Sequence, residues 1–432
     1  MADARDVVII DGVRTPFAKS GTKFKDVHAA ELGRVALKEL VVRTGIEPKL
    51  IEEVIIGNTG SPSDAVNIAR VVALNAGLPK QISAATVHRN CASALESIAN
   101  AFDKIKAGVA DVVIAGGTES MSNMPLIHTR EFTDAFGKMA AAKTLGGRIS
   151  ALTKLKLKDL KPRIAIVEGL TDPFVGINMG ETAEILAKEF GLSREEQDRF
   201  ALGSHVKAIA AQKNGVMAQE TTPVFLPPHF EEIVTTDIGP REGQTMEQLA
   251  KLKPFFDRKY GTVTVGNSCP VTDGAAMVLV TSRAKAQELG LKPVARVVSY
   301  GFAGLEPERM GLGPVYATPV ALKRAGLQLK DMDLIELNEA FAAQVLACVK
   351  AFGSSQFAKD KFGMSQAIGE IKLDTMNVNG GAIALGHPVG ATGTRLVITL
   401  MKEMVRRKSR YGLATLCIGG GQGGAMILER EA

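Results

Sequence analysis

The chain of 432 residues contains no tryptophan, few aromatic residues and no apolar run long enough to cross a membrane. Aromatic side chains make up only 5% of the residues, which argues against the base-stacking surfaces of nucleic-acid-binding modules. A membrane-spanning helix needs about 20 consecutive apolar residues. Because the first residues also show no signal or transit segment, we expect a cytoplasmic protein, or a mature form whose targeting segment has been removed, with no nucleic-acid partner.

Cysteine is also scarce, and the four cysteines stand far apart in the chain without a CxxC pair. They are Cys91, Cys269, Cys348 and Cys417. No histidine stands at metal-ligand spacing from them, so the sequence indicates neither a metal site nor a structural disulfide. In a reducing compartment they are free thiols, and each is either a buried core residue or a nucleophile.

The rest of the composition is that of a soluble globular protein, with 46% hydrophobic and 23% charged residues. The length predicts about two or three domains with a sizeable core. The net charge of +6 arises from 52 basic and 46 acidic residues that are interspersed over most of the chain. This balance suits an anionic small substrate, and it suits simple solubility equally well.

Short β-branched runs alternate with longer amphipathic stretches, which is the pattern of an α/β protein. The runs at 7–10, 54–56 and 112–114 predict strands. Between positions 80 and 120 a helical stretch is followed by a buried strand, and a similar order returns at 380–424. The sequence therefore suggests two related halves.

The residue pattern changes between about 125 and 254, where strand-like runs give way to helical and loop-like stretches. Residues 180–215 predict two consecutive helices, whereas FLPPHF and IGPREGQ indicate loops. The stretch 259–280 then returns to strand and turn residues. We interpret the middle section as a subdomain inserted between two strand-rich halves.

A basic run lies in this middle section, with leucines between its charges: Lys154, Lys156, Lys158, Lys161 and Arg163. A solvated amphipathic face is the ordinary interpretation of such a pattern. The alternative is a surface that meets an anionic partner, an acidic membrane or the phosphates of a cofactor.

Two residues are candidates for nucleophilic chemistry. Cys91 falls at the predicted start of a helix, where the macrodipole and free backbone N–H groups would lower the pKa of a thiol. His387 lies in GHPVGATG, where Pro388 keeps the preceding residue out of helical geometry and the glycines permit close approach by a ligand. The structural alternatives are a buried core cysteine and an ordinary loop histidine.

Cys417 ends the predicted strand LATLCI and is followed by Gly419, Gly420 and Gly421. The amides of such glycines are unshielded by side chains and can form an oxyanion hole or an anion nest. A phosphate-binding loop is the competing interpretation, but the chain contains no GxxxxGK[ST] motif.

A polar pair, Asn338 and Glu339, interrupts the apolar passage from strand to helix in IELNEAFAAQV. Capping of the following helix is the ordinary role for an asparagine at this place. Asn338 could equally hold a water molecule or a carbonyl oxygen.

Five segments in this order and spacing resemble the thiolase family over essentially the whole chain. They are RNCASALE, GGTESMSNMP, LNEAF, NVNGGAIALGHPVGATG and CIGGGQGG. The resemblance implies a thiolase fold of two similar five-layered α/β halves with an inserted loop domain. It assigns 1–124 plus 255–291 to the N-terminal half, 125–254 to the loop domain and 292–432 to the C-terminal half.

The resemblance also implies a catalytic set. Cys91 resembles the nucleophile that takes the acyl group, His387 the residue that activates it, and Cys417 the acid and base. His387 and a water held by Asn338 form one oxyanion hole of the family, and the amides of Cys91 and Gly419 form the other. Met179, Ser268 and Cys269 correspond to positions that contact the substrate or coenzyme A.

The implied activity is the thiolytic cleavage of 3-ketoacyl-CoA in fatty-acid β-oxidation, with coenzyme A as co-substrate and no tightly bound cofactor or metal. The long middle section favours this degradative type over acetoacetyl-CoA thiolase, which is the alternative. A non-catalytic acyl-CoA-binding protein of the same fold is a weaker one. The implied partners are a second copy or three further copies of the chain and a hydratase/dehydrogenase subunit.

Some residues depart from the pattern of many thiolases. Ala94 stands where many have glycine, Asn178 precedes Met179-Gly180 where many have histidine, and Cys269 stands where a serine contacts coenzyme A. These positions concern substrate and pantetheine contacts, so the acyl chain length is open.

Overall fold

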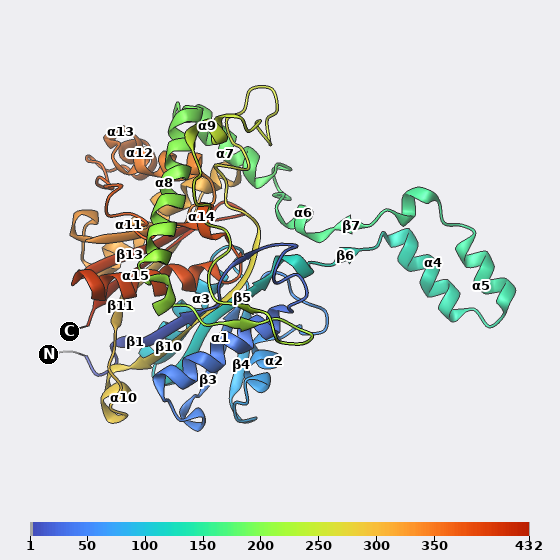
Figure 1. Ribbon diagram of the computed structural model, residues 1–432, viewed down its shortest axis with the longest axis horizontal. Coiled ribbons are helices and arrows are strands. Elements are labelled where there is room, and N and C mark those ends of the chain that lie inside the picture. Colours follow the sequence, from blue (N-terminus) through green and yellow to red (C-terminus); the bar gives the residue numbers. More distant parts are fainter. Residues whose placement is uncertain (1–2, 432) are drawn as a thin grey trace.

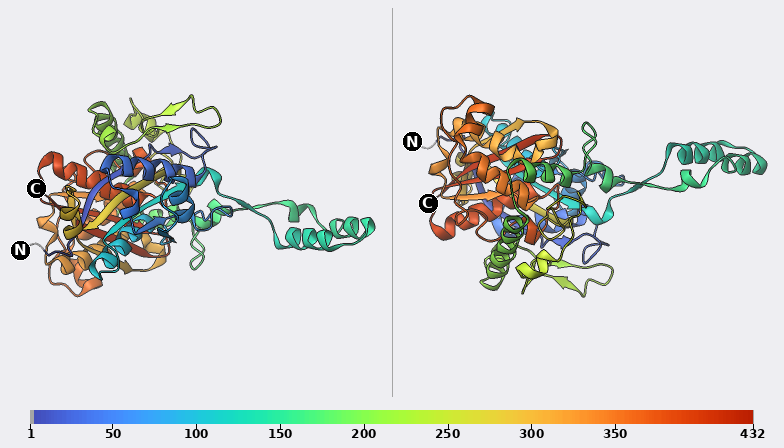
Figure 2. Two further views of the ribbon diagram at one scale, coloured as in Figure 1. Left: turned by 90° about the horizontal axis from the view of Figure 1, so that it is seen from below. Right: turned by 90° about the horizontal axis from the view of Figure 1, so that it is seen from above.

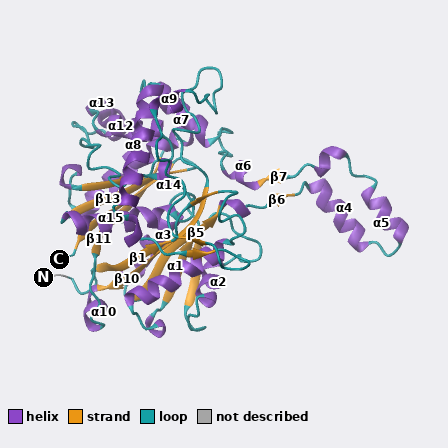
Figure 3. Ribbon diagram, viewed as in Figure 1, coloured by secondary structure: helices purple, strands orange, loops and turns teal. Residues whose placement is uncertain are grey.

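The computed structural model describes residues 3–431, and a ten-stranded mixed sheet forms its centre (Figure 1, Figure 3). The strands lie in the order β12-β13-β14-β11-β1-β10-β5-β3-β4, and β2 pairs with β10. Their bounds are β1 Val7–Arg14, β2 Ala18–Lys19, β3 Glu53–Gly57, β4 Ser83–Val87, β5 Val112–Ser120, β10 Thr272–Ser282, β11 Ala295–Gly304, β12 Leu334–Leu337, β13 Tyr411–Ile418 and β14 Gln422–Arg430. The predicted α/β class is confirmed.

The sheet consists of two halves that meet at a narrow seam. Strand β1 is paired with β11 only through Val8 with Arg296 and Ile9 with Ala295. On its other side β1 is paired along its whole length with β10. The crossover strands are parallel in each half, β3 with β4 and β5 in one and β12 with β13 in the other.

Helices form three layers around these half-sheets, so the two halves together make five layers. Helices α3 (Ser93–Lys106) and α15 (Thr392–Arg407) pack against each other and share one apolar core with the inner sheet faces. Helices α1 (Ala29–Thr44) and α2 (Ile68–Asn75) cover the outer face of the N-terminal half. Helices α11 (Gly313–Ala325) and α12 (Ala342–Phe352) cover that of the C-terminal half.

The inner layer explains why α3 and α15 differ from ordinary surface helices. Leu95, Ile98 and Ile105 of α3 are buried at the spacing of one helical face, as the sequence predicts. Helix α15 is more deeply embedded, and its residues from Thr392 to Met401 are all buried. Because both helices begin beside the same edge of the sheets, their first turns can bring distant segments of the chain together.

Residues 121–271, between β5 and β10, contribute no named strand to the large sheet. The two predicted helices of this section are α7 Met179–Glu189 and α8 Arg194–Lys213. The other elements of this section are η2 Met121–Asn123, α6 Ala165–Gly169, η4 Met217–Gln219, β8 Val224–Phe225, β9 Ile233–Val234 and α9 Met246–Ala250. The predicted limits of a loop domain at 125–254 stay a prediction.

Part of this section, residues 126–164, projects far from the body and is called the arm below (Figure 1, Figure 2). Strands β6 (Leu126–Ile127) and β7 (Arg163–Ile164) pair as its stalk. Helices α4 (Arg130–Ala141) and α5 (Leu145–Leu152) form its tip, followed by the turn η3 (Leu157–Leu160). The four lysines of the basic run therefore lie in turns after α5, Arg163 lies in β7, and the leucines of the run do not share one helix face.

The remaining elements complete the two halves. They are η1 Pro48–Leu50, α10 Arg283–Glu288, η5 Pro307–Leu312, η6 Leu329–Asp331, α13 Ser355–Phe362 and α14 Ala382–Leu385. Among the helices of residues 3–431, none is both long and apolar enough to span a bilayer.

Candidate active site

A cavity of about 500 Å³ opens where the two halves and the inserted section meet. Three of the four cysteines line it together with the predicted histidine. These residues are Cys91, Cys269, His387 and Cys417. The fourth cysteine, Cys348, lies in the core of the C-terminal half, where its thiol donates a hydrogen bond to the carbonyl of Gly311 at 3.2 Å.

Cys91 lies two residues before α3, in a tight turn that follows Asn90, whose φ is +43°. Its own amide and the amide of Gly419 donate to the sulfur, and both lower the pKa of the thiol. Burial outweighs them and raises that pKa. The expectation of a lowered pKa at the start of the helix is therefore wrong for the free protein, because desolvation is the larger effect.

His387 is held by the first turn of α15. Its Nδ1 lies 2.6 Å from the hydroxyl oxygen of Thr392, and this hydroxyl donates to the carbonyl of Pro388 at 3.0 Å. A hydroxyl carries a single proton, so Nδ1–H of His387 must be the donor in the first contact. The tautomer assigned in this way leaves Nε2 without a proton.

The imidazole is also kept neutral. Burial and the positive charge of Arg395 lower the pKa of His387 to about 3. Nε2 is buried, faces the same cavity as the thiols and has no hydrogen-bond partner. An unprotonated Nε2 in the same cavity as a thiol is available as a general base.

Asn338 follows β12 and does not cap the next helix. Helix α12 begins at Ala342, and its N-cap residue Phe341 makes no side-chain capping bond. The backbone N–H of Asn338 donates to Thr415 at 2.9 Å, whereas both polar atoms of its buried side chain lack a partner. The capping interpretation is wrong, since Asn338 follows the strand as a buried residue with a free amide group, and it is not among the residues that line the cavity.

Cys417 lies near the end of β13, is only 1% exposed and is followed by the glycine turn. Burial and the neighbouring Cys91 raise the pKa of its thiol well above the usual value. Gly420 and Gly421 have φ of +87° and +74°, a conformation that side chains other than glycine rarely adopt. The glycines therefore shape this wall of the cavity.

The three predicted contact residues differ in position. Met179 lines the cavity, and its sulfur lies against Gly419. A Cβ atom placed on that glycine would be 3.3 Å from the sulfur. Cys269 also lines the cavity, and burial followed by the proximity of Cys91 raises the pKa of its thiol to about 12. The hydroxyl of Ser268 instead donates to the carbonyl of Thr264 at 2.7 Å, and Ser268 does not line the cavity.

Asn178, the residue before Met179, has a structural role at the start of α7. It caps α7, where its Oδ1 accepts a hydrogen bond from the amide of Gly180 at 3.0 Å. The carboxylate of Glu181 returns to the amide of Asn178 and completes a capping box. The departure from the family pattern at this position thus leaves the start of α7 intact.

Sequence reasoning missed two residues that hold the site. Thr392 orients His387, and its only sequence signal is its place five residues after the histidine in GHPVGATG. The buried carboxylate of Glu119 accepts hydrogen bonds from the amides of Thr59, Gly60 and Gly390. It therefore fastens the turn that carries His387 to a loop of the N-terminal half.

Comparison with known protein families accounts for the grouping of Cys91, His387 and Cys417 in one cavity. Residues 7–284 match the thiolase N-terminal domain, and residues 291–430 match the thiolase C-terminal domain. The chain is a member of the thiolase family. Within residues 3–431 of this thiolase, no group of three or more His, Cys, Asp or Glu side chains is placed to hold a metal ion.

Two relatives are bacterial enzymes of similar length. This thiolase is 43% identical to the 3-ketoacyl-CoA thiolase of Yersinia enterocolitica over 426 residues, which are 98% of this chain and 97% of that one. It is also 43% identical to the 3-ketoacyl-CoA thiolase of Photorhabdus laumondii, with the same coverage.

Two solved structures have the same fold. Human mitochondrial 3-ketoacyl-CoA thiolase matches with a TM-score of 0.85 and 38% identity over 100% of both chains. The acetyl-CoA acetyltransferase of Bacillus anthracis matches with a TM-score of 0.86 and 37% identity over 99% of both chains. The predicted family and fold are confirmed.

Proposed function

We propose that this thiolase cleaves 3-ketoacyl-CoA with free coenzyme A in fatty-acid β-oxidation, yielding acetyl-CoA and a shortened acyl-CoA. One observation carries the proposal: Cys91, His387 and Cys417 line a single cavity. Its relatives named 3-ketoacyl-CoA thiolase, at 43% identity over nearly the whole chain, support the choice of substrate.

In the first half-reaction, Nε2 of His387 takes the thiol proton of Cys91, and the sulfur attacks the 3-keto carbon. The bond between C2 and C3 of the substrate then breaks, and its electron pair moves to C2 as an enolate of acetyl-CoA. The thiol of Cys417 donates its proton to this carbon. Acetyl-CoA leaves, and the shortened acyl group stays on Cys91 as a thioester.

In the second half-reaction, the thiolate of Cys417 takes the thiol proton of incoming coenzyme A. The sulfur of coenzyme A attacks the acyl thioester, and the sulfur of Cys91 departs and recovers its proton from His387. The raised pKa of Cys417 supports this role, because a thiol with a high pKa forms a strongly basic thiolate.

Negative charge develops on two oxygens, and two sets of donors are available for them. The amides of Cys91 and Gly419, which meet at the Cys91 sulfur, are suited to the oxygen of the acyl group. The unpartnered amide of Asn338 is suited to hold a water that, with protonated Nε2 of His387, stabilises the enolate oxygen of acetyl-CoA.

Acetoacetyl-CoA thiolase activity is the second candidate, and the likeness to the acetyl-CoA acetyltransferase of Bacillus anthracis favours it. A thiolysis assay with 3-ketoacyl-CoA substrates from four to sixteen carbons separates the two. We expect turnover of chains longer than four carbons. Activity at four carbons alone would favour the second candidate, and no activity at any length would favour a non-catalytic acyl-CoA-binding protein.

We also infer that coenzyme A lies between the loop domain, residues 125–254, and the two halves. Met179 and the base of the arm support this, because Ile127, Ala165 and Ile166 line the same cavity as Cys91. The need for free thiols at Cys91 and Cys417 supports a reducing compartment such as the cytoplasm.

We propose that the arm is the contact surface for a hydratase/dehydrogenase subunit, the enzyme class whose dehydrogenase step produces 3-ketoacyl-CoA. Apolar side chains of the arm lie in solvent, with Leu145 73% and Leu157 87% exposed. Exposed lysines surround them, so the surface suits an apolar patch with an acidic rim. The family relationship supports assembly of the chain itself into a homodimer or homotetramer.

A further inference from the structure

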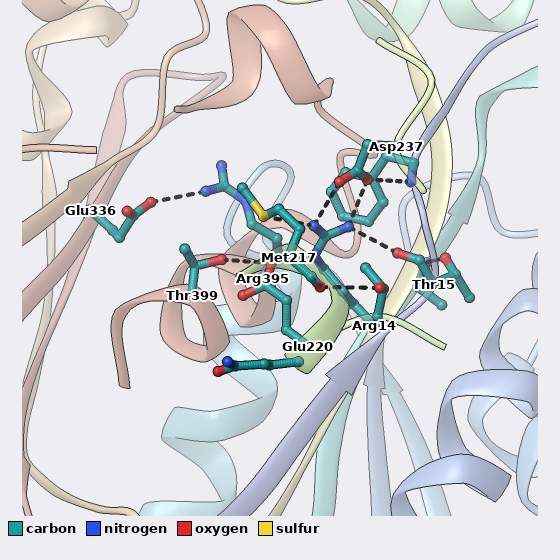
Figure 4. A network of polar contacts seen from close by, with 12 residues as sticks. Arg14, Thr15, Met217, Glu220, Asp237, Glu336, Arg395 and Thr399 are labelled. Carbon is teal, nitrogen blue, oxygen red and sulfur yellow. Dashed lines mark hydrogen bonds and ion pairs between the residues drawn. The ribbon is translucent and has the colours of Figure 1, made fainter. Parts of the chain in front are cut away.

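A buried network of charged residues connects the inserted section with both halves of this thiolase (Figure 4). Arg14 of β1 contacts Glu220 at 2.6 Å and binds both carboxylate oxygens of Asp237 at 2.7 and 2.8 Å. Thr399 of α15 donates to the same Glu220 at 3.2 Å. Every nitrogen of the Arg14 guanidinium that can donate has a partner.

Arg395 of α15 is as deeply buried as Arg14, at 0% exposure, but it is far less well neutralised. Nη1 contacts the carboxylate of Glu336 at 2.9 Å, whereas Nε and Nη2 have no partner among residues 3–431. A buried guanidinium with two unsatisfied nitrogens costs free energy that a larger set of acceptors would offset. A functional role for the Arg395 guanidinium would account for this cost.

The positions of Arg395 and Glu336 link both residues to the active site. Arg395 lies three residues after Thr392 on α15, so the two side chains share one face of the helix whose first turn holds His387. Glu336 lies in β12, two residues before Asn338. The contact between Arg395 and Glu336 therefore joins the helix that orients His387 to the strand that ends at Asn338.

We propose that Arg395 is a positioning residue for His387: its buried cation lies one helical turn after Thr392, which holds the imidazole, and its contact with Glu336 fixes the spacing between His387 and Asn338. The proposal rests on the proposed function in taking His387 as the base. It assigns to Arg395 an action through His387, since Arg395 does not line the cavity.

The other ionisable groups that line the cavity are consistent with this assignment. They are the thiols of Cys91, Cys269 and Cys417, together with His88 and Asp172. The burial of all three thiols raises their pKa values, and Asp172 accepts the amides of Phe174 and Val175 in its own turn. Glu119, behind the turn, is occupied by the amide of Gly390. Burial first, and the positive charge of Arg395 after it, lower the pKa of His387.

A consequence follows for the resting nucleophile. Transfer of the Cys91 proton to His387 creates an imidazolium close to Arg395, and repulsion between the two cations opposes it. The pair therefore stays as neutral thiol and neutral imidazole until the substrate brings an oxygen that can carry negative charge. Arg395 in this way suppresses reaction of Cys91 with other electrophiles.

Alkylation of Cys91 by iodoacetamide tests the proposal without any substrate. The rate is measured in the free full-length enzyme at pH 7, and the modified residue is identified by peptide mass spectrometry. In Arg395→Met we expect alkylation of Cys91 to rise about ten-fold, the equivalent of one pKa unit for His387. Arg395→Lys, which keeps the charge, should stay close to the wild-type rate.

Two controls separate this effect from a loosened core. Thr399→Val removes the hydrogen bond to Glu220 on the same helix and should leave the rate unchanged. Cys348, buried outside the cavity, should stay unmodified in every folded variant. Burial raises the pKa of Glu336 to about 8, so Arg395→Met leaves a carboxyl group that can stay neutral. If Arg395→Met does not fold, the double variant Arg395→Met/Glu336→Gln also replaces this carboxyl group and leaves no buried ionisable group of the pair.

An unchanged alkylation rate of Cys91 in the folded neutral variant, or equal modification of Cys91 and Cys348, would overturn the proposal. The acid limb of the pH profile of kcat should also move to higher pH by about one unit in this variant. Failure of these tests leaves the proposed function intact, whereas loss of thiolysis in the wild type would refute the function itself.

Discussion

The Nδ1 atom of His387 and the hydroxyl oxygen of Thr392 lie 2.6 Å apart, inside the first turn of α15. This contact determines both the direction in which the imidazole faces and the nitrogen that carries its proton. Since Thr392 is fully buried, water does not replace its hydroxyl without rearrangement of the turn.

Thr392→Val should lower kcat by roughly 10²-fold, because the base loses its orientation and its tautomer. The value of KM should change little, since Thr392 does not line the cavity. Steady-state thiolysis kinetics measure both. Thr394→Val is the matched control, because Thr394 lies on the same helix and donates only to the carbonyl of Ala94. Equal losses in the two variants would contradict the role given to Thr392.

Cys417→Ala should still form an acyl-enzyme from acetyl-CoA but should lose cleavage and condensation. Acyl transfer to Cys91 requires only His387, whereas the carbon that leaves requires a proton from Cys417. Incubation with radiolabelled acetyl-CoA measures the first step, and thiolysis measures the second. Cys91→Ser should abolish the acyl-enzyme. Near wild-type cleavage by Cys417→Ala would rule out the two-thiol mechanism.

The two glycines with positive φ after β13 should respond differently to alanine. Both replacements impose a strained backbone, which costs about 1 kcal/mol. At Gly421 the new Cβ would also collide with the carbonyl oxygen of Leu305 and lie 2.8 Å from the nitrogen of Pro307, while at Gly420 it has space. Urea unfolding should therefore show a larger loss of stability for Gly421→Ala, and equal losses would contradict this reading of the turn.

Stability should fall as the pH drops from about 6.5 to 4, partly because of His205 on α8. Burial lowers its pKa from 6.5 to about 4, and Nδ1 accepts the amide of Arg241 at 3.2 Å. In this range the unfolded chain binds a proton that the folded chain does not, so folding weakens by up to roughly 1.4 kcal/mol per pH unit for this one group. His205→Gln should flatten this part of the curve measured by urea unfolding, and an unchanged slope would count against it.

Neutral replacement of the arm lysines should weaken binding of the hydratase/dehydrogenase subunit. The variant changes Lys154, Lys156, Lys158 and Lys161 to glutamine, and capture of the purified subunit is measured at low and physiological salt. A control changes four exposed lysines of the body instead: Lys38, Lys80, Lys251 and Lys330. Undiminished capture, or a loss of sedimentation with anionic vesicles in its place, would contradict the assignment of the arm to this partner.

Much of the architecture could be predicted from the sequence because it depends on local patterns. The spacing of Leu95, Ile98 and Ile105 predicts α3, and the β-branched run at 112–114 predicts the strand that follows. Motifs likewise predict that Cys91, His387 and Cys417 belong to one site, and the three residues do line one cavity.

Other features depend on contacts that no local pattern encodes. The rise in the pKa of Cys91 results from burial in the folded chain, although its position before a helix suggests the opposite. Asn338 looks like a helix cap until the structure shows that α12 begins four residues later, at Ala342. The sequence indicates the arm only as a basic run within a changed residue pattern, because separation from the body is a tertiary property.

The place of β10 between β1 and β5 has a consequence for synthesis on the ribosome. Both of these strands emerge before residue 121, yet their common partner ends at Ser282. Until then, the nascent chain holds two apolar strands whose facing edges are unpaired, while the whole inserted section is translated. The N-terminal half therefore cannot complete its part of the sheet until Ser282 has been synthesised.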